Sequence, residues 1–212
     1  MNRWIRKAAA TFAALTLLGT TMIAAADTQT DAERLRASRR TERYEVSVPG
    51  AAVKAGAGRV FVNAPIATVR RVVTDFAHYQ DFIQRFKRSR VVGKTARTTD
   101  VYLQVPILHG SATVWSLTRF SAPRRLADGT EVIQGTMLDG NVKDFRATWY
   151  LTPIDETHTL LRAELLMVPS LPVPGSLVTD ELKYAADQGV TASRDRAEAL
   201  AVNVASRATT TP

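Results

Sequence analysis

The sequence predicts an α+β fold in which a long C-terminal helix lies against one face of an antiparallel sheet. Three observations support this fold class. Segments with the alternating apolar pattern of strands follow one another between residues 101 and 168. Turn-forming pairs such as Asp128-Gly129 separate most of these segments, as in an antiparallel meander. Beyond the proline-rich stretch 169–175, apolar residues recur at helical spacing to about Arg207.

The first 26 residues have the features of a secretory signal peptide. Basic residues precede an uncharged run over 8–26, which ends in three alanines before Asp27. This order of basic region, apolar region and small-residue cleavage site predicts export, with cleavage near Ala26/Asp27 and delivery to the periplasm or the medium. An uncleaved membrane anchor is the alternative, because the run approaches the roughly 20 residues that span a bilayer. Its threonines favour cleavage.

The exported part is expected to fold as one compact domain over 44–207. A polar tether or loosely held helix over 27–43 precedes it, and a disordered tail over 208–212 follows it. The chain has no cysteine, so its stability comes from a hydrophobic core without disulfides. Loss of the signal lowers the net charge from +8 to +5, because three basic residues are removed. A mildly basic exported protein is expected to meet anionic lipid head groups or cell-wall polymers, with transient contact to anionic membrane surfaces, and to have no nucleic-acid partner.

The domain is predicted to begin with a strand around Val53 to Val62. Asn63 is then expected to cap a helix, and Pro65 suits its first turn. This helix should run from Ile66 to Val73. A short second helix after Asp75 carries an aromatic stripe at a spacing of three and four, formed by Phe76, Tyr79, Phe82 and Phe86.

Two interpretations of the aromatic stripe stay open. It lies in a basic segment, residues 70–97, so it would serve as a gate that meets an anionic membrane and admits an apolar ligand. Alternatively, the stripe is part of the core and the charges form an ordinary solvated face.

The strands also indicate which side chains face the helix. Alternate residues of a strand share a face, so Phe145 and Trp149 should point to the helix together with Leu165. The bulky Trp115 and Met137 are expected to border or fill the same space. Arg119, on the face of Trp115, would bind a ligand carbonyl or phosphate or pair with an acidic group such as Glu164, with exposure at a sheet edge as the alternative. The predicted strands are Val101–Ile107, Ser111–Phe120, Glu131–Leu138, Val142–Leu151 and Thr159–Val168.

The final helix is expected to start at Ser176. Its apolar face is small in the middle, where Ala186 and Gly189 follow Leu182. Small side chains here leave volume for an apolar ligand if the sheet curls around the helix. They would equally permit close packing of the helix on the sheet. The sequence supports both interpretations.

The order of these elements resembles the START-like polyketide cyclase/dehydrase (SRPBCC) superfamily, in particular its coenzyme-Q-binding-type branch. The similarity rests on Val62-Asn63-Ala64-Pro65, Asp75-Phe76, Tyr79, Phe82, the stretch from Gly140 through Trp149 to Pro153, and the proline-rich start of the last helix. It covers about Val53 to Leu200. Many relatives have Trp near Val69 and Pro at the place of Gln84, so the cavity entrance differs here.

The resemblance implies the helix-grip fold, a curved antiparallel sheet wrapped around the C-terminal helix with an internal apolar cavity. Members of the superfamily carry lipids, sterols or polyprenyl quinones, or cyclise and dehydrate polyketides. We therefore expect an exported, non-catalytic protein that binds or transfers a lipid, sterol-like or isoprenoid/quinone molecule. The expected ligand-binding residues are Phe76, Tyr79, Phe82, Phe86, Trp115, Arg119, Met137, Phe145, Trp149, Leu165, Leu182, Ala186 and Gly189.

Two alternatives to a carrier stay open. The first is a cyclase/dehydratase-type enzyme acting on a polyketide-like substrate, with Arg119 or Tyr150 as acid or oxyanion stabiliser. The second is a signalling module whose partner binds the basic aromatic segment and whose core has no cavity.

No metal, cofactor or catalytic set is predicted. His78, His109 and His158 are far apart in the sequence and form no short-range metal motif. The segment Gly56-Ala57-Gly58 lacks the spacing and the following helix of a phosphate-binding loop, so it is interpreted as a bend or bulge.

Overall fold

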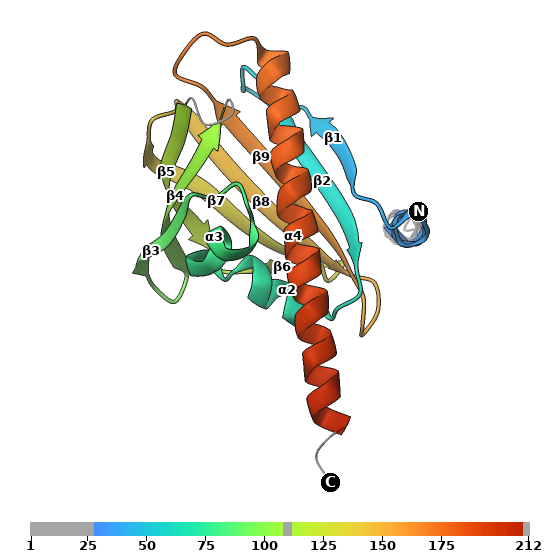
Figure 1. Ribbon diagram of the computed structural model, residues 1–212. Coiled ribbons are helices and arrows are strands. Elements are labelled where there is room, and N and C mark those ends of the chain that lie inside the picture. Colours follow the sequence, from blue (N-terminus) through green and yellow to red (C-terminus); the bar gives the residue numbers. More distant parts are fainter. Residues whose placement is uncertain (1–27, 108–111, 210–212) are drawn as a thin grey trace, which may run out of the picture.

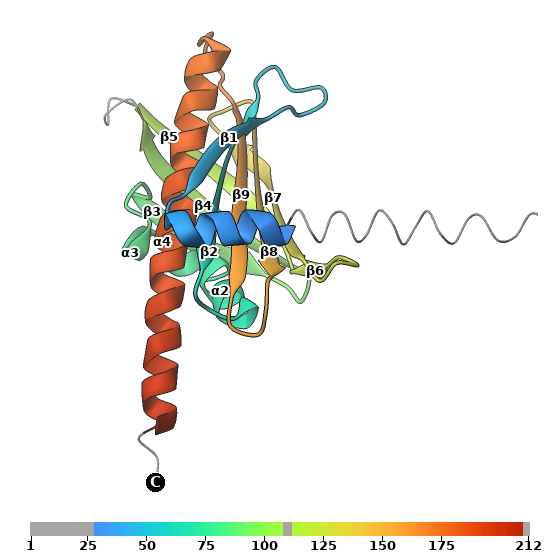
Figure 2. The same cartoon turned by 90° about the vertical axis from the view of Figure 1, so that its right-hand side faces the viewer.

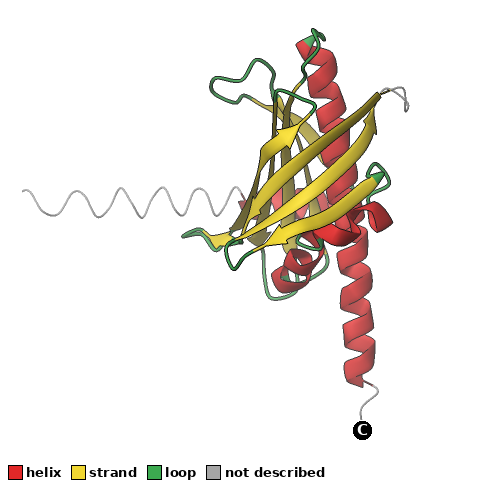
Figure 3. Cartoon of the chain, turned by 90° about the vertical axis from the view of Figure 1, so that its left-hand side faces the viewer, coloured by secondary structure: helices red, strands yellow, loops and turns green. Residues whose placement is uncertain are grey.

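In the computed structural model, which describes residues 28–107 and 112–209, an antiparallel sheet curves around one side of a long helix, α4 (Gly175–Thr209) (Figures 1 and 3). The predicted α+β class and helix-grip architecture are thereby confirmed. The predicted signal peptide, the His109-Gly110 turn and the last residues of the predicted tail lie outside the described residues. No described helix combines the length and apolar character needed to cross a bilayer.

The sheet has nine strands, and its order is β1-β2-β9-β8-β7-β5-β4-β3, with β6 paired to β7. All the paired strands are antiparallel. The bounds are β1 (Glu42–Val46), β2 (Ala55–Val62), β3 (Arg88–Lys94), β4 (Thr98–Ile107), β5 (Ala112–Ser121), β6 (Arg124–Arg125), β7 (Glu131–Gly140), β8 (Asp144–Pro153) and β9 (Thr159–Val168). The predicted strands do not include β3, begin β4 three residues late and end β7 two residues early.

The first predicted helix is present as α2 (Ile66–Val73), which follows Pro65 and buries Val69, Val72 and Val73. The expected cap is wrong, however, because no side chain caps the N-terminus of α2. Asn63 instead donates from its backbone N–H and its side-chain amide to Glu198 Oε1, both at 2.8 Å. Asn63 therefore ties the end of β2 to α4.

The aromatic stripe does not lie on one helix. A 3₁₀ turn, η1 (Phe76–His78), leads directly into the single turn of α3 (Tyr79–Phe82). The backbone becomes extended at Ile83, so Phe86 lies beyond the helix. Even so, Tyr79 contacts the rings of both Phe82 and Phe86, with centroids 5.6 and 5.5 Å apart.

Two glycines of β2 let α4 lie directly on the sheet. A Cβ atom at Gly56 would come within 2.2 Å of the backbone of Leu182, and one at Gly58 within 3.0 Å of Ala186. Both glycines pair in regular register with β1 and β9, so the predicted bend or bulge is wrong. The glycines serve close packing of helix on sheet.

The segment expected to be a polar tether or a loosely held helix is a docked helix followed by β1. Residues 28–38 are helical, and Ala32 and Leu35 are buried against Phe61 and Leu160. The neighbours Val60 and Val62 belong to the main core, so Phe61 lies on the opposite face of the sheet, where Figure 2 shows the helix crossing the strands. The segment is rich in charged residues, and its two buried apolar residues, Ala32 and Leu35, are too few for its composition to indicate a docked helix.

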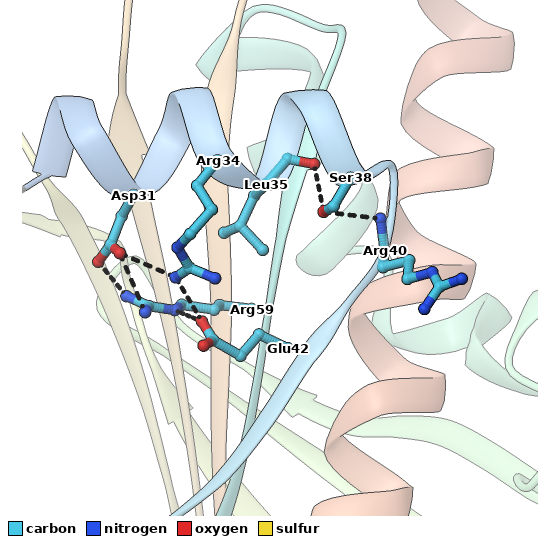
Figure 4. Close-up of polar contacts among 7 residues, drawn as sticks. All are labelled: Asp31, Arg34, Leu35, Ser38, Arg40, Glu42 and Arg59. Atoms are coloured by element: carbon cyan, nitrogen blue, oxygen red, sulfur yellow. Dashed lines mark hydrogen bonds and ion pairs between the residues drawn. The ribbon is translucent and has the colours of Figure 1, made fainter.

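A cluster of ion pairs holds this N-terminal helix (Figure 4). Arg59 of β2 donates from Nε to Glu42 at 2.5 Å and from Nη2 to Asp31 at 3.2 Å. Arg34 bridges the same two carboxylates at 2.9 and 3.0 Å. Burial acts to raise the pKa of Asp31, but the hydrogen bonds from Arg34 and Arg59 outweigh it and lower the pKa below 3.8. The same two arginines lower the pKa of Glu42 below 4.5.

Acid is therefore expected to release the N-terminal helix. Because both pKa values are depressed by folding, the stabilisation is present above about pH 4.5 and is lost as the pH falls through the lower folded values. Hydrogen-exchange protection factors for residues 28–38, compared at about pH 6 and about pH 3, should fall selectively. In Arg59→Met the protection should already be low at the higher pH. Equal protection at both pH values in the unmodified protein would contradict this role of the cluster.

Candidate functional site

A cavity of about 120 Å³ lies between α4 and the inner face of the sheet. Its walls come from β4, β5, β8 and β9, from α4, and from the segment 79–86, which comprises α3 and the turn that follows it. Almost all of the lining atoms are apolar. Representative lining residues are Leu103, Phe120, Phe145, Trp149, Leu165 and Met167.

Strand alternation explains which side chains line the cavity. In β8, Phe145, Ala147 and Trp149 point inward, and in β9, Ala163 and Leu165 do the same. The register sets Ala147 opposite Leu165 and Trp149 opposite Ala163, so small and large side chains face each other across the two strands. The resulting floor is uneven and leaves space beneath α4.

The small side chains in the middle of α4 allow close packing on the sheet and also leave space for the cavity. Ala186 and Leu182 approach β2 through its glycines and also line the cavity. Ala185 and Gly189 line it as well, and a Cβ atom at Gly189 would meet the Trp149 ring at an ordinary 3.5 Å. The small helix face therefore packs closely on β2 and also leaves volume between α4 and the sheet.

Eight of the expected ligand-binding residues line the cavity, namely Tyr79, Phe86, Phe145, Trp149, Leu165, Leu182, Ala186 and Gly189. Three others of the thirteen pack close to it. Phe76 stacks behind the wall on Phe120, with centroids 4.4 Å apart. Phe82 lies under the guanidinium of Arg196, 4.7 Å from its ring centroid, and Met137 packs with the buried cluster of Val142, Met167, Val178 and Leu182.

Trp115 and Arg119 lie on the outer face of the sheet, so their expected place in the site is wrong. The inward residues of β5 are Val114, Ser116 and Phe120, which makes the odd positions outward. Trp115 stacks on Tyr102, and Arg119 is exposed and binds Asp100 through two hydrogen bonds of 2.7 and 2.8 Å. Its partner is thus Asp100 rather than Glu164.

Tyr150 also points away from the cavity. Its hydroxyl donates to Glu164 at 3.3 Å, and the guanidinium of Arg162 lies 3.8 Å from its ring centroid. Because neither Tyr150 nor Arg119 reaches the interior, the acid and oxyanion roles considered for them in an internal active site are wrong.

The cavity includes residues that sequence reasoning missed. Arg85 comes from a turn without periodic signal, so no pattern indicates its direction, whereas Ile83 follows Tyr79 at the helical spacing of four. Glu181 comes from α4, where its charge suggested a solvated position. Helical spacing offered one clue, because Glu181 lies one turn before Ala185.

Four polar side chains contribute to the wall. The Tyr79 hydroxyl donates to the Val73 carbonyl, and burial raises the pKa of Tyr79, so it stays protonated. Ser116 shares a hydrogen bond of 2.9 Å with Thr118. Arg85 donates to Glu181. In residues 28–107 and 112–209, no three His, Cys, Asp or Glu side chains are grouped so that they would hold a metal ion.

The size and lining of the cavity suit an apolar molecule. A cavity of roughly 150 Å³ lined by Leu, Ile and Phe stays dry and binds benzene. A compound of about that size therefore fits this protein without rearrangement, whereas drug-sized ligands occupy pockets of about 300 Å³ or more. A lipid would require α4 or the segment 79–86 to move outward.

Gly189→Ala is expected to stabilise the fold. Glycine inside a helix costs about 1 kcal/mol relative to alanine, and the new methyl group would meet only the Trp149 ring at an ordinary distance of 3.5 Å. The free energy of unfolding, measured in urea, should rise by about 0.5 to 1 kcal/mol. A decrease would mean that Trp149 lies closer to α4 than described.

Comparisons with known proteins agree with this geometry. The model of the polyketide cyclase/dehydrase and lipid transport family matches residues 56–202. The STAR-related lipid transfer protein of Xanthomonas axonopodis is 15% identical, with 74% of this chain and 93% of that one covered and a TM-score of 0.64. Human StAR-related lipid transfer protein 5 is 11% identical, with 83% and 97% covered and a TM-score of 0.64.

Not all of the similar structures are lipid carriers. An aromatase/cyclase from a Streptomyces species is 14% identical, with 75% of this chain and 94% of that one covered and a TM-score of 0.52. At these identities the similarity concerns the fold alone. No curated protein sequence matches the chain.

Proposed function

The chain belongs to the polyketide cyclase/dehydrase and lipid transport family, and from this premise we propose that it is an exported protein that binds or transfers a hydrophobic ligand without changing it chemically. The ligand class is a lipid, a sterol-like molecule or an isoprenoid such as a quinone. The observation that carries the proposal is the apolar cavity of about 120 Å³ between α4 and the sheet.

Burial of apolar surface supplies the binding energy. A ligand that buries roughly 200 Å² of apolar surface gains about 5 kcal/mol at roughly 25 cal/mol per Å². This gain corresponds to a dissociation constant on the order of 0.2 mM before the costs of ordering. A longer ligand that follows the interior past Phe145 and Met167 would gain more. Affinity thus grows with the length of the apolar part.

The carrier function is favoured over the enzyme alternative by the polar content of the wall. With Arg119 and Tyr150 outside, cyclisation or dehydration would have to use Tyr79, Ser116, Arg85 or Glu181. The hydroxyls of Tyr79 and Ser116 are engaged in hydrogen bonds within the wall. The signal-like N-terminus supports export, and the exposed basic residues from Lys87 to Arg97 support transient contact with anionic membranes.

Native mass spectrometry of the protein, purified from its producing cells without detergent, tests this proposal. We expect a stoichiometric adduct that organic extraction releases as an apolar molecule, on a chain that begins at Asp27. Protein that is empty and also fails to bind a panel of lipids, sterols and quinones would contradict the carrier function. A chain that retains residues 1–26 would contradict cleavage of the signal.

A further inference from the structure

One cationic side chain reaches the otherwise apolar cavity. Arg85, in the turn between α3 and β3, lines the cavity with only 16% of its side chain exposed. Among the described lining residues, Arg85 and Glu181 are the ones that carry charge. Their ion pair links the turn to α4, so it lies where two walls of the cavity meet.

Contacts from α4 hold the guanidinium in place. Its Nη2 donates to Glu181 Oε1, and its Cζ lies 5.2 Å from the centroid of the Tyr184 ring. The Tyr184 hydroxyl in turn accepts a hydrogen bond of 2.8 Å from Gln188. Glu181, Tyr184 and Gln188 recur at helical spacing on one face of α4, so the group is oriented before any ligand arrives.

The other terminal nitrogen of the Arg85 guanidinium, Nη1, forms no hydrogen bond within the described residues. This atom is buried. A buried donor without a partner is destabilising, and more so when it belongs to a charged group. The hydroxyls of Tyr79 and Ser116, by contrast, already form hydrogen bonds. Nη1 is thus a donor without a partner, and a ligand oxygen that reached it would supply one.

The charge of Glu181 determines which kind of ligand atom can accept a hydrogen bond from Arg85 Nη1. Glu181 already neutralises Arg85, so a ligand carboxylate would bring a second negative charge beside Glu181 in a largely apolar site. A single uncharged oxygen would accept from Nη1 without that repulsion. Resting on the proposed function, we propose that Arg85 Nη1 binds a carbonyl or hydroxyl oxygen at the polar end of an otherwise apolar ligand and that the apolar part lies between Trp149 and Leu165.

Three small probes of matched shape test the assignment: butylbenzene (apolar), benzylacetone (a neutral ketone) and phenylbutyrate (an anion). For each probe, the dissociation constant of a variant is compared with that of the unmodified protein. The free energy of removing the probe from water is the same in both measurements, so it cancels from the ratio. In Arg85→Met, benzylacetone should bind at least about tenfold more weakly, as expected for loss of a hydrogen bond to a charged donor. Butylbenzene should bind as before, which also reports a folded cavity.

Removing the Glu181 carboxylate should shift the preference of the site from the neutral probe towards the anionic one. In Glu181→Gln the charge of Arg85 is no longer balanced, so phenylbutyrate should bind at least about tenfold more tightly than to the unmodified protein. Benzylacetone should change little. Arg88→Met, at an exposed position of β3, is the control and should leave all three affinities unchanged.

The outcomes separate this inference from the proposed function. If butylbenzene binds and Arg85→Met weakens neither benzylacetone nor phenylbutyrate selectively, the role of Arg85 is overturned while the cavity remains a binding site. If Arg85→Met selectively weakens phenylbutyrate instead, the ligand is an anion and the neutral-acceptor assignment is wrong. If no probe binds to the unmodified protein, both the proposed function and this inference fail.

Discussion

Gly56→Ala is expected to lower the free energy of unfolding by about 3 kcal/mol, at the upper end of the range for overpacked interiors. The added Cβ would lie 2.2 Å from the carbonyl carbon of Leu182 and 2.2 Å from the backbone nitrogen of Lys183. These are backbone atoms of α4, so no side-chain rotation relieves the clash. Since β2 is paired with β1 on one side and β9 on the other, relief requires α4 to move away from the sheet.

Gly93→Ala provides the matched control on another strand of the same sheet. A Cβ at Gly93 would meet Asp100 at an ordinary 3.5 Å, and β3 is an edge strand. Its stability should change by less than about 1 kcal/mol. Urea unfolding with equal slopes for the unmodified protein and both variants provides the measurement. Nearly equal midpoints for Gly56→Ala and Gly93→Ala would mean that α4 does not lie directly on β2.

Ala147→Leu is expected to remove the ligand site while the fold persists. Ala147 lies at the floor of the cavity in β8, and the longer side chain would extend into the space that a ligand needs. Displacing a benzene-sized probe from the cavity should cost about 3 kcal/mol of binding free energy, or a factor of more than about one hundred. Filling an existing cavity should change the free energy of unfolding by less than about 1.5 kcal/mol.

Thr148→Leu is the control for this prediction. Its neighbours Ala147 and Trp149 both line the cavity, so the side chain of Thr148 lies on the other face of the same strand. Butylbenzene should bind this variant as it binds the unmodified protein, in a titration followed by calorimetry. Binding that survives in Ala147→Leu and is lost in Thr148→Leu would place the site on the outer face of the sheet.

Periodicity predicted the fold well because it reports burial directly. The long apolar face of α4 and the inward residues of β8 and β9 follow from helical and strand spacing alone, and they include the centre of the cavity. The same rule failed in β5, where both alternating sets contain large apolar residues. Trp115 and Leu117 are outward, while Val114 and Phe120 are inward, and neither composition nor spacing distinguishes these faces.

Features that depend on contacts between distant segments could not be predicted from the sequence. Residues 28–38 suggested a tether or a loosely held helix because their apolar residues are few, yet Leu35 packs against Phe61 of β2 and is buried there. Arg85 lies in an irregular turn, and its direction is set by Glu181, which is 96 positions further along the chain. The role of Gly56 likewise appears only when α4 lies above it.

The proposed function requires that the space between α4 and the sheet accepts an apolar molecule. Anomalous diffraction from crystals soaked with bromobenzene tests this claim most directly, because the bromine position is read without assuming where the ligand lies. We expect a bromine peak in the cavity, in contact with Trp149, Leu165 and Gly189. Well-ordered crystals in which bromine appears only on the outer surface, with side chains filling the interior, would contradict it.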